Sequence, residues 1–259
     1  MLKVNPMIEL SIHESVATIT LRRPQVKNAI GTQMSAELKD IRTEVGRDKT
    51  VKVVIITGAE PDVFCAGTDL EEFYAFKNTA ERIAIFSVAS IVDSFNCPTI
   101  AAINGDALGQ GLELALACDL RICSQNATFG MPQIAAGEIP WDGGTQRLAR
   151  LVGRARALEL MLLGETIDAS RAHQIGLVHR VVPSADLMTA VMDLAQKMAA
   201  KSAVSLTYVK EAIHKGMDLT LEQGLRLEAD LYYLIHTTED RTEGIQAFRE
   251  KRPPQFKGK

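Results

Sequence analysis

Two glycine-containing junctions are the parts of this sequence best suited to chemistry. Residues 64–73 (FCAGTDLEEF) and 104–114 (NGDALGQGLEL) each follow an apolar run and lead into a helical pattern. Small residues let the backbone turn sharply and approach a ligand, and the first N–H groups of a helix have no intrahelical acceptor. Two such N–H groups aimed at one oxygen form an oxyanion hole. For one junction alone, a simple tight turn is the preferred interpretation.

The second junction also carries an acidic residue, Glu113, in an otherwise apolar helical segment. Its neighbours from Leu112 to Ala117 are apolar on nearly every face, so we expect the carboxyl group to be buried. Burial raises the pKa of a carboxylic acid, which suits proton transfer near neutral pH. Glu113 is therefore interpreted as a catalytic acid/base, in preference to a helix residue that escapes to solvent.

Composition limits the class of protein. The chain has 259 residues with 46% hydrophobic content, which suits one large α/β domain or a domain with an appendage. A net charge of −3 and the lack of a basic cluster interleaved with aromatics argue against nucleic-acid binding. The longest apolar stretch, residues 112–123, is interrupted by two acids, so we expect no membrane span. With no visible signal peptide, a cytoplasmic location is expected.

The four cysteines show no CxxC spacing. Three of them lie in apolar runs, where cysteine usually packs as a small hydrophobe. We therefore expect a reduced compartment, with neither disulfides nor a metal site.

Alternating strand and helix patterns must position the two junctions. Residues 51–57 form an apolar β-branched run typical of a strand covered on both faces. Helical spacing predicts an amphipathic helix over 33–46 and a single helix over 79–95. Short buried strands are predicted at 99–103 and 119–123. Strands separated by helices imply crossover connections and a largely parallel arrangement.

The pattern of hydrophobic residues changes after Gly143. Helical patterns dominate there, and one strand is predicted at 178–182. From about residue 201 the chain is essentially all helix. This part is too small and too amphipathic to be an independent catalytic domain. We expect it to pack on the core or on a neighbouring subunit.

A series of motifs runs in order through nearly the whole chain. They are Arg23-Pro24 with Asn28-Ala29, residues 64–70 (FCAGTDL), 107–115 (ALGQGLELA), 117–122 (ACDLRI), Phe129-Gly130, and residues 143–148 (GGTQRL), 176–178 (GLV) and 247–253 (AFREKRP). Together they resemble the crotonase (enoyl-CoA hydratase/isomerase) superfamily. The resemblance implies an α/β, crotonase-like spiral of ββα units over residues 1–200, which holds the CoA site. It also implies a helical C-terminal region, 201–259, for trimerisation and active-site cover, and homotrimers or dimers of trimers.

The resemblance further implies an acyl-CoA substrate whose thioester oxygen accepts hydrogen bonds from the backbone N–H groups of Thr68 and Gln110. Coenzyme A enters as part of that substrate, and no metal or separate cofactor is implied. Family members usually have a small residue at the first position and glycine at the second. Because the backbone donates, Thr and Gln can serve if the dihedral angles at position 110 suit a residue with a Cβ.

Four residues match CoA contacts of the family: Ala66, Asp69, Leu70 and Lys251. The backbone at Ala66 is implied to reach the adenine. Lys251 resembles a residue that contacts a CoA phosphate, sometimes from a neighbouring subunit, and an exposed C-terminal lysine is its other interpretation.

The second acid of the family is absent here. Family hydratases carry a second Glu after the Phe-Gly-x-Pro element, and this position is Gln133. In the family the two acids together hold and activate a water across the double bond. An amide can position water or hydrogen-bond Glu113, but it cannot transfer a proton at ordinary pH. The predicted catalytic residues are therefore Glu113 and Gln133, with Glu113 as the principal acid/base.

Residues 139–144 (IPWDGG) also differ from the small residues usual before Gly-Gly-Thr. Certain family dehalogenases and dienoyl isomerases place a catalytic Asp where this chain has Trp141. Trp141 is hypothesised to shape an acyl pocket for a flat or cyclic substrate, together with residues 71–77. Asp142 is either a second polar group of that pocket or the N-cap of the helix beginning at Gly143, and the cap is favoured. Glu138 is a further candidate, better interpreted as a solvated loop charge.

These residues predict an enzyme that reversibly adds water to an α,β-unsaturated acyl-CoA, cyclic ones included, through a thioester enolate. The alternatives are a single-acid enoyl-CoA isomerase or another enolate reaction such as hydrolysis or decarboxylation. A non-catalytic CoA-binding or RNA-associated scaffold is the rival of another class, against which Glu113 and both loops argue. The five histidines fall on none of the matched positions and are interpreted as surface or packing residues.

Overall fold

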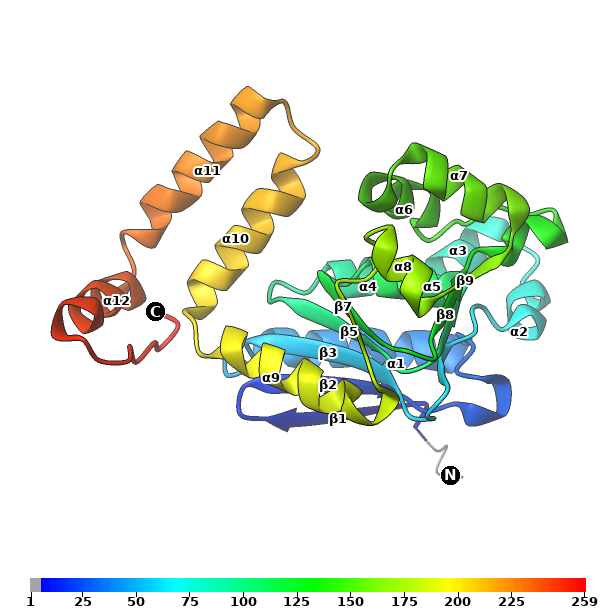
Figure 1. The fold of residues 1–259 in the computed structure, drawn as a ribbon, viewed down its shortest axis with the longest axis horizontal. Coiled ribbons are helices and arrows are strands. Elements are labelled where there is room, and N and C mark those ends of the chain that lie inside the picture. Colours follow the sequence, from blue (N-terminus) through cyan, green and yellow to red (C-terminus); the bar gives the residue numbers. More distant parts are fainter. Residues whose placement is uncertain (1–5) are drawn as a thin grey trace.

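Two β-sheets form the centre of the computed structural model, which describes residues 6–259 (Figure 1). The larger sheet has the strand order β1-β2-β3-β5-β7-β10. Its strands are Ile8–His13, Val16–Leu21, Val53–Gly58, Thr99–Ile103, Leu120–Ser124 and Arg180–Val182. β1 pairs with β2 antiparallel, and the remaining neighbours are parallel.

The smaller sheet has the order β4-β6-β8-β9, formed by Val63–Cys65, Asp106–Leu108, Thr128–Gly130 and Thr166–Asp168. Its first three strands are parallel and β9 is antiparallel. From β3 to β8 successive strands alternate between the sheets, so β3, β5 and β7 lie in the larger one while β4, β6 and β8 lie in the smaller one. Helical segments follow each pair, and this repeated ββα course confirms the predicted fold class.

The helices fall into three groups. Those before β7 are α1 (Thr32–Arg47), α2 (Leu70–Ala75), α3 (Thr79–Phe86), α4 (Ala89–Asp93) and α5 (Gln110–Leu116), with the 3-10 turn η1 (Pro24–Val26). Those after β8 are η2 (Pro132–Ala136), α6 (Gly144–Val152), α7 (Arg154–Leu163), α8 (Ala169–Gln174), η3 (Ser184–Asp186) and α9 (Leu187–Ala199). The last group is α10 (Ala203–Gly216), α11 (Leu221–Ile235) and α12 (Glu239–Glu250). Across residues 6–259, none of these helices combines the length and apolarity that a bilayer crossing requires.

Strand β3 is covered on both faces, as its apolar run predicts. Val53 and Ile55 pack with apolar residues of α9 on one face, while Val54 and Ile56 belong to the main core on the other. Successive strand side chains point to opposite faces, so a strand between two helical layers needs apolar residues at every position. The continuous apolar run in the sequence therefore correctly predicted that both faces of this strand are buried.

The single helix predicted over residues 79–95 is wrong. Helix α3 ends at Phe86, and the separate helix α4 begins at Ala89. At the break, the backbone N–H groups of Val88 and Ala89 both donate to Oδ2 of Asp142, at 2.9 Å each. A carboxylate that accepts the first N–H groups of a helix stabilises a new helix start. The apolar spacing continues across this break, which is why periodicity did not reveal it.

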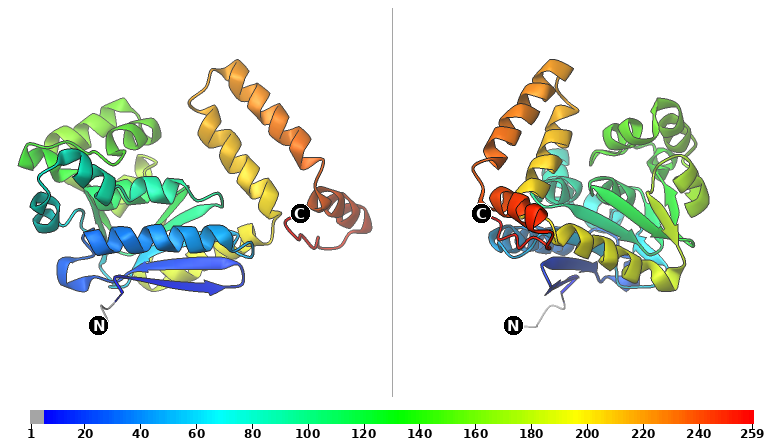
Figure 2. Two further views of the ribbon diagram at one scale, coloured as in Figure 1. Left: turned by 180° about the vertical axis from the view of Figure 1, so that it is seen from behind. Right: turned by 60° about the vertical axis from the view of Figure 1, so that its left-hand side comes forward.

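Helices α10 to α12 form a C-terminal arm that projects from the sheets (Figures 1 and 2). Asp119 anchors its first helix, because Oδ2 lies 2.8 Å from Nζ of Lys210 and Oδ1 lies 2.9 Å from Nε2 of His214. Burial opposes ionisation of Asp119, but His214 and Lys210 outweigh it and lower the pKa of this carboxyl to about 2. The arm is thus held to the core by an ionised, part-buried acid.

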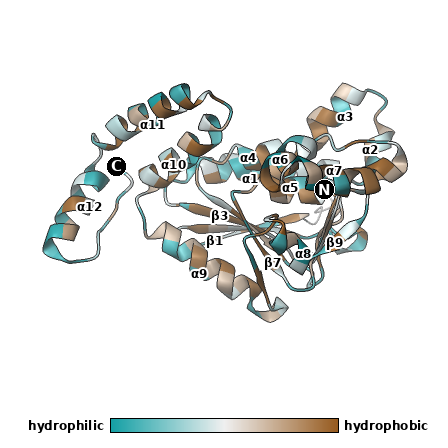
Figure 3. Ribbon diagram, turned by 45° about the horizontal axis from the view of Figure 1, so that its top comes forward, coloured by the Kyte–Doolittle hydropathy of each residue, from teal (hydrophilic) through white to brown (hydrophobic). Residues whose placement is uncertain are grey.

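The arm leaves many large apolar side chains uncovered, and hydrophobic residues recur along α10 and α11 in Figure 3. The exposed set includes Val209, Ile213, Met217, Leu221, Leu225, Tyr232, Tyr233 and Phe248. Phe248 is 85% exposed. Soluble chains rarely leave large contiguous apolar surfaces open to water, so such a surface marks an interaction site.

Candidate active site

Two glycines shape the loops that carry the predicted oxyanion hole. Gly67 has φ of +116° and precedes Thr68, while Gly109 has φ of +52° and precedes Gln110. Residues with a side chain rarely adopt these angles, so glycine is required at both turns. A Cβ added to Gly67 would lie 3.7 Å from the backbone nitrogen of Gln110. The two loops are therefore in contact.

The N–H groups of Thr68 and Gln110 are both left free by the backbone. Ile30 donates to the carbonyl of Gly67 at 2.7 Å, and Asp69 donates to the carbonyl of Ile30 at 2.9 Å. This pairing leaves the N–H of Thr68 without an acceptor within residues 6–259. Gln110 is the first residue of α5, so its N–H has no intrahelical acceptor. The positive φ falls on Gly109, and Gln110 itself carries its Cβ without strain.

The side chains of the same two residues are hydrogen-bonded to each other. Oγ1 of Thr68 donates to Oε1 of Gln110 at 2.7 Å. Nε2 of Gln110 donates to the carbonyl of Phe86 and, at 3.1 Å, to Oδ2 of Asp142. Because both amide hydrogens and the amide oxygen have partners, the buried side chain of Gln110 is held in one orientation.

Glu113 is buried, as its apolar neighbours predict, with no exposed surface. Burial is the main reason that its pKa is raised to about 7, and the charge of Asp142 raises it further. The backbone N–H groups of Gly144 and Asp142, which donate to Oε1 at 2.7 and 2.8 Å, and the nearby Arg147 oppose the rise. The carboxyl group can therefore both accept and release a proton near neutral pH.

Gln133 lies on η2 beside the start of α5. Its Nε2 lies 3.5 Å from the position that a Cβ of Gly109 would take, and Glu113 donates its own N–H to the carbonyl of Gly109 at 3.1 Å. The side chain of Gln133 therefore lies beside Gly109, one helical turn before Glu113, and no hydrogen bond joins the side chains of Gln133 and Glu113. The buried Oε1 of Gln133 has no partner in the described part of the chain.

Asp142 does not cap the helix that follows it, so that prediction is wrong. Helix α6 begins at Gly144, and its N-cap position is taken by Gly143, whose φ is +103°. The buried carboxylate of Asp142 instead accepts from Val88, Ala89 and the side chain of Gln110. Burial raises the pKa of this group, against the opposing hydrogen bonds. Its partners come from residues far away in the chain, which local sequence cannot indicate.

Arg147 is a residue near the site that the sequence did not single out. Its Nη1 donates to the carbonyl of Asp142 at 3.1 Å, and its charge lowers the pKa of both Glu113 and Asp142. It lies within the GGTQRL motif, and membership of this motif is the feature of the sequence that could have indicated its place near the site.

Trp141 belongs to a cluster of aromatic rings. It stacks on Phe73 of α2 with centroids 5.5 Å apart and an interplanar angle of 24°. Phe73 in turn meets Phe86 edge to face at 5.2 Å, and the guanidinium of Arg82 lies 5.4 Å from the Phe73 centroid. The structure therefore joins Trp141 to the 71–77 segment, as the pocket hypothesis requires. Glu138 accepts from the hydroxyl of Tyr74 on the same segment.

The residues matched to CoA contacts fall into two places. Ala66 and Asp69 flank the Thr68 loop, and Leu70, 53% exposed, begins α2. The carboxylate of Asp69 accepts from the N–H of Glu72 at 3.1 Å and pairs with Arg23 at 2.8 Å. Lys251 is exposed at the end of α12, and α12 and α2 lie at opposite ends of the long axis in Figure 1. One chain therefore does not bring Lys251 to the Thr68 loop.

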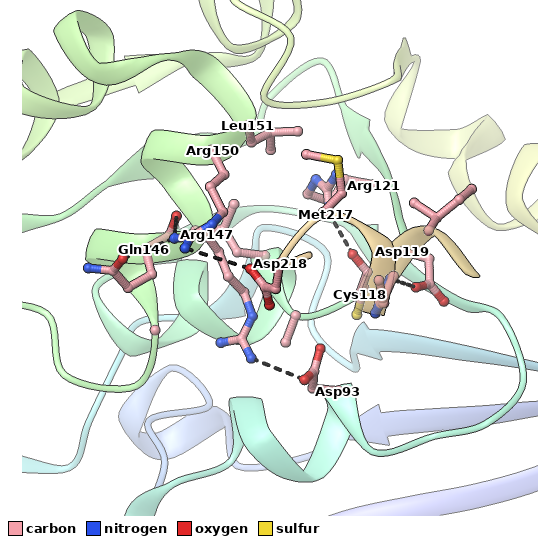
Figure 4. Close-up of a pocket in the computed structure, with 15 residues that line it drawn as sticks. Asp93, Cys118, Asp119, Arg121, Gln146, Arg147, Arg150, Leu151, Met217 and Asp218 are labelled. Carbon is pink, nitrogen blue, oxygen red and sulfur yellow. Dashed lines mark hydrogen bonds and ion pairs between the residues drawn. The ribbon is translucent and has the colours of Figure 1, made fainter. Parts of the chain in front are cut away.

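A cavity of about 560 Å³ lies between α6, α10 and the end of α5 (Figure 4). Arg147 pairs across it with Asp93 at 3.5 Å, and Arg150 pairs with Asp218 at 3.8 Å. It reaches α5 at Leu116, whereas Gln110 and the oxyanion loops are at the other end of that helix. Neither Glu113 nor Gln133 lines this cavity, but Gly143 and Arg147 do, so it adjoins the candidate active site without containing the acid or the amide.

Comparison with known proteins places this geometry in context. Residues 11–259 match the sequence model of the enoyl-CoA hydratase/isomerase family. The chain is 42% identical over 249 residues to YngF of Bacillus subtilis, a protein assigned to the enoyl-CoA hydratases/isomerases, covering 95% of this chain and 96% of that one. It is 40% identical over 252 residues to the 2,3-dehydroadipyl-CoA hydratase of Escherichia coli, covering 96% and 98%. The crystal structure of enoyl-CoA hydratase from Bacillus anthracis superposes with a TM-score of 0.95 at 38% identity, covering 98% and 100%.

Proposed function

The chain belongs to the enoyl-CoA hydratase/isomerase family, and we propose that it reversibly adds water to an α,β-unsaturated acyl-CoA. The main support is a pair of buried oxygens without hydrogen-bond partners among residues 6–259, Oε2 of Glu113 and Oε1 of Gln133. Asp119 Oδ1 also lacks a hydrogen bond there, but it has the imidazole of His214 2.9 Å away. A water has two O–H groups, and we propose that one water donates to both of these active-site oxygens.

The proposed reaction uses Glu113 for both proton transfers. The thioester oxygen accepts hydrogen bonds from the N–H groups of Thr68 and Gln110, and Gln133 orients the water. The carboxylate of Glu113 takes one proton from the water while the water oxygen bonds to the β-carbon. The electron pair of the double bond moves toward the thioester oxygen, where the two N–H groups stabilise the enolate. The proton on Glu113 then passes to the α-carbon and restores the carboxylate.

The second candidate is an enoyl-CoA isomerase, which the amide at position 133 favours. Gln133 cannot transfer a proton, so Glu113 is the one acid/base of the pair. An isomerase needs only one such group, which removes a proton from one carbon of the enolate system and returns it to another. No water takes part in that reaction.

The two reactions are separated with two substrates. Purified protein is incubated with crotonyl-CoA and, separately, with trans-3-hexenoyl-CoA, and the conjugated enoyl absorbance is followed. We expect this absorbance to fall with crotonyl-CoA as 3-hydroxybutyryl-CoA forms, which mass spectrometry identifies by the gain of one water. Inert crotonyl-CoA together with a rise in conjugated absorbance from the 3-enoyl ester would reject the hydratase in favour of the isomerase.

The acyl group that we propose is flat or cyclic and apolar. The part-exposed ring of Trp141 packs on the buried ring of Phe73, which in turn meets Phe86, and a flat acyl group can stack on the Trp141 ring. The E. coli relative is named for a dehydroadipyl substrate, which ends in a carboxylate. A cyclohexene-1-carbonyl-CoA ester in the same assay, compared with crotonyl-CoA, examines the preference directly.

We further propose that the C-terminal arm joins subunits into trimers or dimers of trimers, with residues 66–70 and the Lys251 of a neighbouring subunit contacting CoA. The uncovered apolar side chains of α10 and α11 support this assembly, and so does the distance of Lys251 from the Thr68 loop within one chain. Sedimentation equilibrium or native mass spectrometry is expected to give three or six times the chain mass of 28.3 kDa. A monomer at micromolar concentration would contradict it.

A further inference from the structure

The two loops that carry the proposed thioester donors are tied together by side chains as well as by backbone. Thr68 donates its hydroxyl to Gln110, and Gln110 donates its amide to Asp142. The three residues come from different segments, one before α2, one at the start of α5 and one before α6. They form a continuous hydrogen-bonded chain from one donor loop, through the other, to Asp142.

Asp142 is the anchor of this chain because it is itself fixed on two sides. Its Oδ2 accepts two backbone N–H groups at the start of α4, and only 6% of the residue is exposed. Its backbone N–H donates to Oε1 of Glu113 at 2.8 Å. One residue is therefore bonded both to the side chain of a donor residue and to the carboxyl group of the proposed acid/base.

We propose that Asp142 is a positioning residue of the active site, which holds the Thr68 and Gln110 donors in register with each other and with Glu113. It acts through hydrogen bonds and need not touch the substrate. Donor groups stabilise an oxyanion only when they are already placed, and a displacement of about 1 Å can lower a rate about 100-fold. This inference rests on the proposed thioester site and deepens it.

Asp142 also adds a negative charge near Glu113. This charge adds to the effect of burial in raising the pKa of Glu113, and Arg147 is the cation that opposes it.

Three variants separate the hydrogen bonds from the charge. Asp142→Asn removes the charge and leaves an oxygen able to accept from α4 and Gln110. Asp142→Ala removes both, so the difference between these two variants isolates the hydrogen bonds. Gln110→Ala breaks this series of hydrogen bonds, while Asp142 can still accept from the N–H groups at the start of α4. It therefore tests the proposal even if Asp142→Ala fails to fold. The control is Asp168→Ala, which deletes an exposed Asp that caps α8 by accepting from Arg171 at 2.7 Å.

The readout is enolate formation by bound acetoacetyl-CoA, followed by its ultraviolet absorbance at fixed pH with saturating ligand. This measures stabilisation of a thioester-type oxyanion without any hydration step. We expect Asp142→Ala and Gln110→Ala to lower the bound enolate-to-keto ratio about tenfold or more below Asp142→Asn. Asp142→Asn should equal or exceed the native protein, because it removes a negative charge near a developing anion. Asp168→Ala should match the native protein.

Other outcomes would contradict the positioning role of Asp142 or the proposed hydration. Equal ratios for Asp142→Ala and Asp142→Asn, or a native ratio for Gln110→Ala, would overturn the positioning role. A native protein that forms no bound enolate would overturn it as well, since the donors would not form the site. A native protein that forms the enolate but leaves crotonyl-CoA unchanged would reject only the proposed hydration, and the variant ratios would still decide the role of Asp142.

Discussion

Replacing Glu113 with Gln lowers the rate of hydration by about 10²–10⁴-fold, the range expected when a general acid/base is removed. The amide has nearly the same shape, and its Oε1 can still accept the N–H groups of Asp142 and Gly144 that hold the carboxylate now. The substitution therefore removes proton transfer and leaves the oxyanion donors in place. We expect kcat with crotonyl-CoA to fall while KM changes little.

The same substitution should make the fold more stable above pH 7. Burial raises the pKa of Glu113 from 4.5 to about 7, so between these pH values the unfolded chain loses its proton first. Stability therefore falls as pH rises from about 4.5 to 7, and above pH 7 the full cost of about 3 kcal/mol is present. Glu113→Gln has no charge to bury and avoids this cost.

The measurement is urea unfolding of both proteins at one protein concentration, at pH 5 and pH 8. The variant is expected to gain about 3 kcal/mol over the native protein at pH 8, and much less at pH 5. Glu159→Gln on α7 is the control, because Glu159 is exposed and should alter neither rate nor stability. A Glu113→Gln protein that hydrates at the native rate would contradict the assignment of Glu113 as the acid/base.

The pH dependence of the native enzyme follows from the same group. Hydration begins with Glu113 ionised, so kcat/KM should rise with pH through about 7 and then level off. Burial is the main cause of this raised pKa; of the neighbouring charged groups, Asp142 raises it further and Arg147 lowers it. The rise of kcat/KM with pH through about 7 should be absent from the residual activity of Glu113→Gln.

Replacing Gln133 with Glu should raise the hydration of crotonyl-CoA by about 10²-fold or more, because it restores a second proton-transferring group. Gln133 lies beside Gly109, one helical turn before Glu113, and we expect a carboxyl group at this position to act in the same site as Glu113. Two carboxyl groups that share a site repel each other, and one of them then keeps its proton near neutral pH. The protonated group can supply the α-carbon while the ionised one activates water.

This change should also alter the shape of the pH profile. With one base required ionised and one acid required protonated, kcat/KM becomes bell-shaped, where the native profile has a single rising limb. The control is Gln125→Glu, an exposed position that gives the same change of charge. An unchanged or lower rate for Gln133→Glu would mean that the native reaction does not use a water between these two side chains, and would favour the isomerase.

Much of the architecture could be predicted from local pattern. The strand β3 and the helix α1 were predicted to within two residues at each end, because their apolar spacing records which faces are buried. The burial of Glu113 followed from its apolar neighbours in the same way. The two loops with Gly67 and Gly109 were predicted because only glycine permits such turns.

The two wrong predictions, the single helix over 79–95 and the N-cap role of Asp142, concern places where a residue distant in sequence forms the hydrogen bonds. Apolar spacing continues across Ser87 and Val88, yet the helix breaks there because Asp142, 54 residues later, accepts the free N–H groups. For the same reason Asp142 does not cap its own neighbouring helix. A carboxylate binds whichever unpaired donors are closest in space, and sequence spacing does not specify these.

The sequence by itself therefore determined the alternation of strands and helices, the two glycine turns and the buried acid. Through the ordered motifs it also determined the family, and with it the ββα spiral. Only the tertiary structure decided that Thr68, Gln110 and Asp142 form one hydrogen-bonded chain, and that Lys251 lies far from the Thr68 loop of its own chain. The physical reason is the range of each effect. Burial patterns and backbone angles are properties of neighbouring residues, whereas hydrogen bonds between side chains depend on how distant segments approach in the folded protein.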